Sequence, residues 1–93
     1  MLKIEVTNRF KKDLDEAIKR GCKYSNLQII LEYLSSETRL PDKYKDHKLK
    51  DSKYYKNVRE CHIQPYWLLI YQIKKDKLIL SLIRNGTHTT LFK

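Results

Sequence analysis

The first third of the chain changes from the period of a strand to the period of a helix. Apolar and charged residues alternate over 2–6, as they do in a half-buried strand. Apolar residues then recur at helical spacing in two stretches. This spacing predicts one helix over 8–20, capped by Thr7, and a second that is capped by Ser25 and ends at Ser36. A strand followed by a helical hairpin is therefore expected.

The second half of the chain has the pattern of an antiparallel sheet. Apolar segments at 58–63, 67–73 and 77–83 are joined by short polar turns, which predicts a three-stranded meander. The central strands carry apolar residues at consecutive positions, so both faces of the sheet should be covered, one of them by the helices. The Asn-Gly pair at 85–86 predicts a tight turn into a last segment, 87–92.

Residues 37–55, between the helices and the meander, show no sustained apolar period and predict a long loop. Loops longer than about 12 to 15 residues are uncommon in small domains and are often functional or disordered. Aromatic residues, leucine and His47 within it argue against plain disorder. Its lysines either form a solvated surface or contact RNA, and the candidates for contact are Lys45, Lys48, Lys50 and Lys53.

Length and charge narrow the functional classes. The 93 residues predict a single domain, 1–93, because two cores would each be too small to be stable. Twenty Lys and Arg against eleven Asp and Glu give a net charge of +9, which makes nucleic acid the leading partner class. The longest apolar run, 67–71, is far shorter than the roughly 20 residues of a spanning helix, and the start lacks a secretory pattern. We expect a cytoplasmic protein without a membrane partner.

The two cysteines lack the spacing of a metal site, and in a reducing compartment both are expected to be free thiols. Cys61 precedes His62, but neighbours in a strand point to opposite faces, so Cys61 is interpreted as a core residue. Trp67 shares a strand face with Tyr71; it is either a core residue or a platform on which an RNA base stacks. Histidine spacing does not favour zinc, so neither a metal nor a small-molecule cofactor is expected.

Three histidines, His47, His62 and His88, are candidates for acid–base chemistry, although a lone histidine is more often structural. Alternation places Glu60 and His62 on one side of their strand. Arg84 ends an apolar stripe formed by Leu78, Leu80 and Leu82, at the edge of the sheet. RNA cleavage by transesterification needs a base, an acid and cations that steady the phosphate, and it requires no metal. Histidine and arginine supply these groups.

Several motifs in fixed order resemble one known family. They are Tyr44–Leu49 (YKDHKL), Arg59–Pro65 (RECHIQP), Trp67–Tyr71 (WLLIY) and Gly86–His88 before Leu91 and Phe92. Together with the order of elements, they resemble the YafQ branch of the RelE-like toxins nearly end to end. The resemblance implies an α+β, RelE-like microbial RNase fold. In that fold, an N-terminal strand and a two-helix hairpin pack on a mostly antiparallel sheet of four to five strands.

The resemblance also implies a function and partners. Toxins of this family belong to type II toxin–antitoxin systems, and are mRNA interferases that enter the ribosomal A site, contact ribosomal RNA, cut translated mRNA and so inhibit translation. A cognate antitoxin, whose acidic segment wraps the toxin, silences them. A homo-oligomer of the toxin alone is not expected.

Residue by residue, the resemblance implies a site made of His47, His62, His88 and Phe92. It also implies an acidic residue at Glu60 and a phosphate-stabilising arginine at Arg84. The chain departs from the family pattern at Tyr66, where aspartate is common. The phenol of tyrosine, with an ordinary pKa of about 10, is a poor base at neutral pH.

These residues give one hypothesis of mechanism and one alternative. In the hypothesis, His88 is the general acid, His47 or His62 the base, and Arg84 with nearby lysines the clamp on the transition state. In the alternative, the change at Tyr66 weakens or abolishes activity. The chain is then a non-catalytic module that binds RNA or the ribosome and an antitoxin.

Overall fold

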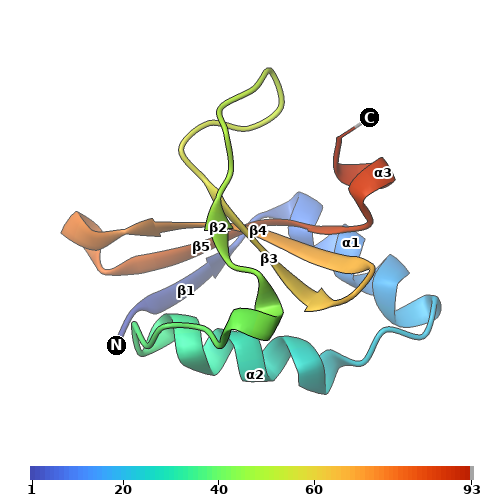
Figure 1. The fold of residues 1–93 in the computed structure, drawn as a ribbon, viewed down its shortest axis with the longest axis horizontal. Helices are drawn as coiled ribbons and strands as arrows, with labels where there is room; N and C mark the ends of the chain where they lie inside the picture. The colour runs from blue at the N-terminus through green and yellow to red at the C-terminus, as the bar shows by residue number, and fades with distance from the viewer. Residues whose placement is uncertain (93) are drawn as a thin grey trace.

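A five-stranded sheet carries two long helices on one face and a short helix on the other (Figure 1). The computed structural model describes residues 1–92. The strand order is β1-β5-β4-β3-β2, with β1 parallel to β5 and every other pair antiparallel. The strands are β1 (Lys3–Val6), β2 (His47–Lys48), β3 (Arg59–Gln64), β4 (Trp67–Lys74) and β5 (Ile79–Gly86). The helices are α1 (Asn8–Lys19), α2 (Tyr24–Ser35) and α3 (His88–Leu91). The expected α+β architecture is confirmed.

The two long helices begin by different means. The Thr7 hydroxyl accepts a hydrogen bond from the Phe10 N–H at 2.9 Å, so the predicted cap of α1 is confirmed. The predicted cap of α2 by Ser25 is wrong, because α2 begins at Tyr24, behind Lys23. Instead, the side chain of Gln64, at the end of β3, accepts a hydrogen bond at the start of α2. Its Oε1 accepts from the Lys23 N–H at 3.0 Å.

Both faces of the sheet are covered, as predicted. The larger core lies between the sheet and the two long helices, and it includes Ala17, Leu27, Ile30, Cys61, Leu69 and Leu82. A smaller apolar cluster lies on the opposite face, beneath α3 and the end of the long loop. It consists of Tyr55, Val58, Leu68, Ile70 and Leu91. We call this opposite side the open face, because neither long helix covers it (Figure 1).

A bulge in β5 changes which side chains face the helices. Tyr71 of β4 pairs with Leu82, whereas Ile70 pairs with Arg84, so Ile83 is an extra residue. Directly paired residues share a face, so Arg84 lies with Ile70 on the open face, while Leu82 packs under the helices. The predicted common stripe of Leu78, Leu80, Leu82 and Arg84 is therefore wrong. Leu78 is also outside it: it has a φ of 55° and lies in the turn before β5.

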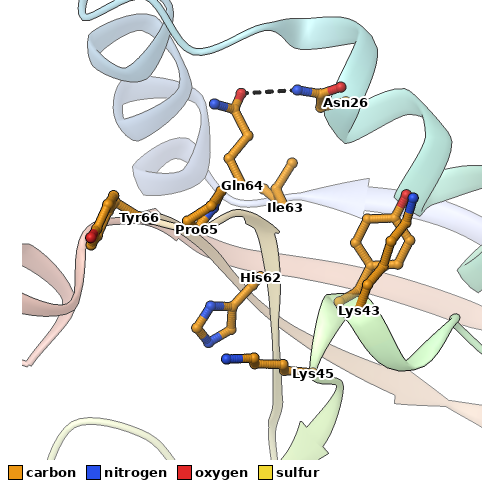
Figure 2. Close-up of a pocket in the computed structure, with 9 residues that line it drawn as sticks. Asn26, Lys43, Lys45, His62, Ile63, Gln64, Pro65 and Tyr66 are labelled. Atoms are coloured by element: carbon orange, nitrogen blue, oxygen red, sulfur yellow. Dashed lines mark hydrogen bonds between the residues drawn. The ribbon is translucent and has the colours of Figure 1, made fainter.

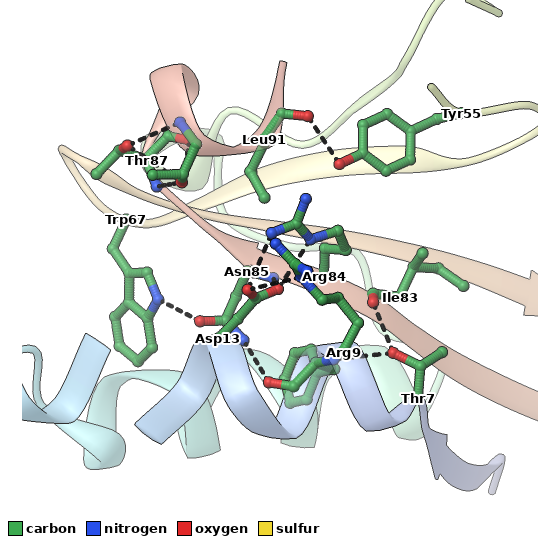
Figure 3. A network of polar contacts seen from close by, with 12 residues as sticks. Thr7, Arg9, Asp13, Tyr55, Trp67, Ile83, Arg84, Asn85, Thr87 and Leu91 are labelled. Atoms are coloured by element: carbon green, nitrogen blue, oxygen red, sulfur yellow. Dashed lines mark hydrogen bonds and ion pairs between the residues drawn. The ribbon is translucent and has the colours of Figure 1, made fainter. Parts of the chain in front are cut away.

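The Asn-Gly pair does not form the predicted tight turn. Asn85 and Gly86 are the last residues of β5, and Thr87 then caps α3 through a reciprocal pair of bonds with Thr90. The reason lies in Asn85, whose buried side chain forms hydrogen bonds through both its oxygen and its nitrogen. Its Oδ1 accepts from the Trp67 indole at 2.9 Å, and its Nδ2 donates to the Phe10 carbonyl at 3.2 Å (Figure 3).

The segment predicted as a long loop contains a short 3-10 turn (Asp42–Tyr44) and the two-residue strand β2. Asp46 anchors this strand to the sheet. Its carboxylate accepts hydrogen bonds from the Arg59 guanidinium, at 3.0 Å, and from the Tyr71 hydroxyl. His47 is therefore held in a fixed register, opposite Glu60 of β3.

Candidate active site

The sheet register places most of the predicted site residues in two neighbouring rows on the open face. One row runs across four strands and contains His47, Glu60, Ile70 and Arg84. The next row contains His62, Leu68 and Gly86. His62 follows Glu60 by two positions on β3, so their side chains share a face, as alternation predicts. His47, Glu60 and His62 thus form one group.

His47 and Glu60 are in direct contact. The Nε2 atom of His47 lies 3.5 Å from Oε1 of Glu60, and its Nδ1 lies 2.7 Å from the Lys45 carbonyl oxygen. A carbonyl only accepts, so Nδ1 carries a proton and donates it. A second proton, on Nε2, would make the contact an imidazolium–carboxylate pair. Both ring nitrogens of His47 therefore already face protein atoms.

Glu60 is a buried acid with an incomplete set of partners. Its side chain is 7% exposed, and within residues 1–92 its Oε2 atom has no hydrogen-bond partner. Burying a carboxylate oxygen without a partner costs free energy, so such an atom calls for an explanation, and a functional role is one of them. Glu60 is consequently the strongest structural indication of a site on this face.

His62 is half-buried and lies at a pocket of about 590 Å³ beside the turn between β3 and β4 (Figure 2). Figure 2 shows the Lys45 side chain extending beside the His62 ring. No hydrogen bond to the His62 ring is present in the described part of the chain. Its imidazole is therefore free to exchange a proton with a bound molecule.

His88 lies apart from the other two histidines. It is exposed at the start of α3, where its ring packs against the Phe92 ring at a tilt of 38°, with 4.8 Å between centroids. Phe92 in turn meets the Tyr55 ring edge-on at 5.6 Å, and the Tyr55 hydroxyl donates to the Leu91 carbonyl at 2.9 Å. Strands lie about 4.8 Å apart, so Gly86, two residues before His88, is about 10 Å from His62 across β4.

Arg84 is separated from the histidine group. Leu68 and Ile70 of β4, which belong to the apolar cluster, lie between Arg84 and that group. The Arg84 guanidinium donates two hydrogen bonds to Asp13 of α1, at 2.9 and 3.0 Å (Figure 3). These bonds raise the pKa of Arg84 above its ordinary value. The structure thus gives Arg84 a role in joining α1 to β5, which differs from the free phosphate clamp that the sequence suggested.

Known proteins match this geometry and sequence over nearly their whole length. Residues 2–93 match the family described as bacterial toxin of type II toxin-antitoxin system, YafQ. The chain belongs to the YafQ family. The mRNA interferase toxin YafQ of Escherichia coli (strain B / BL21-DE3) is 41% identical over 90 residues, covering 96% of this chain and 94% of the relative.

Solved structures agree with this assignment. A metal-bound toxin from Helicobacter pylori is 44% identical, covers 99% of this chain and 100% of that one, and has a TM-score of 0.91. YafQ in the E. coli DinJ-YafQ complex is 37% identical, covers 100% of both chains and has a TM-score of 0.86. In residues 1–92 of the present YafQ-family chain, no group of three or more His, Cys, Asp or Glu is arranged to hold a metal ion.

Two further observations bear on binding by this YafQ-family toxin. The interpretation of Trp67 as a base-stacking platform is wrong, because Trp67 is 2% exposed and lies in the core beneath the helices. The RNA-binding candidates Lys45, Lys48, Lys50 and Lys53 are all exposed, which their proposed role requires.

None of the helices in the described part of the chain has the length and apolar character needed to cross a membrane.

Sequence reasoning missed three residues that shape this face: Asp46, Asp13 and Tyr55. Each acts through a partner that is distant in the chain, namely Arg59, Arg84 and Leu91. The available signals were weak. Asp46 precedes a candidate histidine, and Tyr55 ends the loop, but neither position indicates which side chain it will contact.

Cys61 is a core residue, and both cysteines are free thiols, as expected. Burial raises the pKa of the Cys61 thiol, whereas Cys22 is only half-buried. In the folded protein at pH 8, iodoacetamide is therefore expected to alkylate Cys61 at least about tenfold more slowly than Cys22, since the thiolate is the nucleophile. Peptide mass spectrometry over time measures both rates, and urea-unfolded protein is the control. Equal rates in the folded protein would show that Cys61 is accessible.

Proposed function

We propose that this YafQ-family toxin is an endoribonuclease that cuts mRNA during translation. The observation that carries the proposal is the group of His47, buried Glu60 and His62 on the open face of a protein with a net charge of +9. The name of the E. coli relative, an mRNA interferase toxin, supports the same reaction. Positive charge favours binding to RNA and ribosomes through their phosphates.

In the proposed reaction, the 2′-oxygen of a ribose attacks the adjacent phosphorus and the bond to the 5′-oxygen breaks. The products are a 2′,3′-cyclic phosphate and a free 5′-hydroxyl. His62 is the better candidate for the base that takes the 2′-hydroxyl proton, because both nitrogens of His47 already face Lys45 and Glu60. His88 is the candidate acid that protonates the leaving 5′-oxygen.

Cations near the histidine group are assigned the role of stabilising the negative charge on the phosphate. Lys45 extends beside His62 and supplies a positive charge there. Arg84 would have to release Asp13 before it could reach the phosphate. Tyr66, exposed in the turn between β3 and β4, replaces the aspartate that is common in the family, so the reaction is assigned to histidines.

An acidic antitoxin is the proposed protein partner. The solved E. coli DinJ-YafQ toxin-antitoxin complex supports an antitoxin partner. The excess of nine positive charges on this chain favours association with an acidic segment. Ribosomal RNA in the A site is the proposed docking surface for the active toxin, through the same cations.

Translated mRNA provides the test. We expect primer extension to detect new 5′ ends when the toxin is added to ribosomes translating a message. The same message without a start codon should remain intact, because cleavage requires translation. If the translated message also remains intact while the toxin binds ribosomes in a salt-sensitive manner, the chain is a non-catalytic binding module.

A further inference from the structure

The proposed acid–base reaction assigns no role to the pocket beside His62. Its volume of about 590 Å³ is within the range of small-ligand sites. Its lining includes Lys43, Tyr44, Lys45, His62, Gln64 and Tyr66, and no acidic residue. It therefore combines cations, aromatic rings and an amide in one pocket, whose lining also includes a candidate catalytic group.

The Gln64 amide is fixed in orientation. Its Oε1 accepts from the Lys23 backbone N–H at 3.0 Å and from Asn26 Nδ2 at 3.1 Å (Figure 2). A backbone N–H can only donate, so the oxygen and nitrogen of the Gln64 amide are assigned without ambiguity. Among the described residues, Nε2 has no protein partner, which leaves two N–H donors for a bound molecule. A base edge that carries acceptor atoms fits such a donor.

Lys45 is also positioned by the backbone. It has a left-handed φ of 51° at the end of the 3-10 turn, and its carbonyl oxygen accepts from His47. One residue thus fixes His47 through its backbone and extends an ammonium group beside His62 (Figure 2). An ammonium at this place can bind the phosphate on either side of the reacting ribose.

Two tyrosines give the pocket aromatic surface. Tyr44 is half-buried, and the Lys43 ammonium lies 5.1 Å from its ring centroid. Tyr66 is 87% exposed, so its ring is accessible to a bound molecule. Bases of single-stranded RNA stack on exposed aromatic rings without strong sequence preference.

We propose that this pocket is a subsite for one nucleotide of single-stranded RNA, next to the phosphate that is cut. Lys45 binds the phosphate, Tyr66 stacks on the base, and Gln64 Nε2 donates to acceptors on the base edge. The subsite rests on the proposed function, because His62 both lines the pocket and is the candidate base of the proposed reaction. An acidic peptide would satisfy the lysines but would use neither the exposed ring nor the fixed amide donors.

Binding of an uncleavable RNA tests the subsite without ribosomes. The probe is a single-stranded hexanucleotide with 2′-O-methyl groups, which lack the attacking hydroxyl. We expect NMR titration to shift the signals of Tyr44, Lys45, His62 and Tyr66. Lys45→Met should weaken binding about fivefold and reduce the dependence of log affinity on log salt by about 0.7, the value for one phosphate contact on a single strand.

Two matched variants sharpen this test. Lys77→Met removes the same charge from an exposed lysine outside the pocket, so it should leave affinity nearly unchanged. Gln64→Glu keeps an oxygen acceptor for Lys23 and Asn26 but removes the amide donors and adds negative charge. It should preserve the thermal unfolding midpoint and weaken RNA binding about fivefold, on the scale of one surface charge contact.

The outcomes separate the subsite from the reaction. If Lys45→Met and Gln64→Glu bind the RNA as tightly as the unmodified protein, or the signals that shift lie only outside the pocket, the subsite is contradicted, even if mRNA is cut. If the RNA affects only Lys45, as an acidic peptide would, and leaves Tyr66 and Gln64 unaffected, the proposed base contacts are also contradicted. Binding as expected without cleavage of translated mRNA would contradict the proposed function alone.

Discussion

Replacing His88 by alanine is expected to lower the single-turnover rate of mRNA cleavage by about 100-fold or more, the usual scale for loss of a general acid. The imidazole is exposed at the start of α3, and among residues 1–92 its ring contacts Phe92 without a hydrogen bond to the protein. Its removal therefore takes away a proton donor with little effect on the fold. Quench-flow measurement with toxin in excess over programmed ribosomes reports this rate.

Thr89→Ala is the matched control for His88→Ala. Thr89 is the next residue of α3 and is also exposed, so its replacement tests whether any change in this helix slows cleavage. We expect the Thr89 variant to cut at the rate of the unmodified toxin, and both variants to unfold at similar temperatures. An unchanged cleavage rate in His88→Ala would remove His88 from the reaction.

The largest expected loss of stability comes from Asn85→Ala, which should lower the free energy of unfolding by about 3 kcal/mol, because each buried polar group that loses its partner costs about 1 to 3 kcal/mol. Asn85 is 1% exposed and joins three elements. Its side chain accepts from Trp67 of β4 and donates to Phe10 of α1. Alanine would leave the indole N–H and the Phe10 carbonyl buried without this partner.

Urea unfolding, followed by tryptophan fluorescence, measures this loss. Asn8→Ala is the control, since Asn8 is exposed in the first turn of α1 and its replacement should change stability by less than about 0.5 kcal/mol. If Asn85→Ala unfolds within that same margin, the side chain does not hold α1 and β4 to β5 as the structure indicates.

The parts of the fold that the sequence predicted are those governed by local chemistry. The Thr7 cap and the apolar stripe of α1 depend on residues within one or two helical turns. The strands of the meander follow from short apolar runs between polar turns. Predictions failed where a distant partner decides the conformation: Gln64 caps α2 from β3, and Asn85 bonds to Phe10 and Trp67 instead of forming a turn.

The same division applies to the candidate site. Alternation along β3 is local, and it correctly placed Glu60 and His62 on one face. The contact between His47 and Glu60 was not predictable, since β2 has only two residues and is held through Asp46 and Arg59. The bulge at Ile83, which moves Arg84 to the other face, has no signal in the alternation itself.

The division of the sheet into a helical side and an open side has a consequence for inhibition. Every candidate acid–base residue lies on the side away from α1 and α2 or on α3. An inhibitor that bound only the two long helices would leave the candidate imidazoles uncovered, and could act only by steric exclusion of the toxin from a confined space. One that covers the candidate site directly must extend across the open face of the sheet as far as α3.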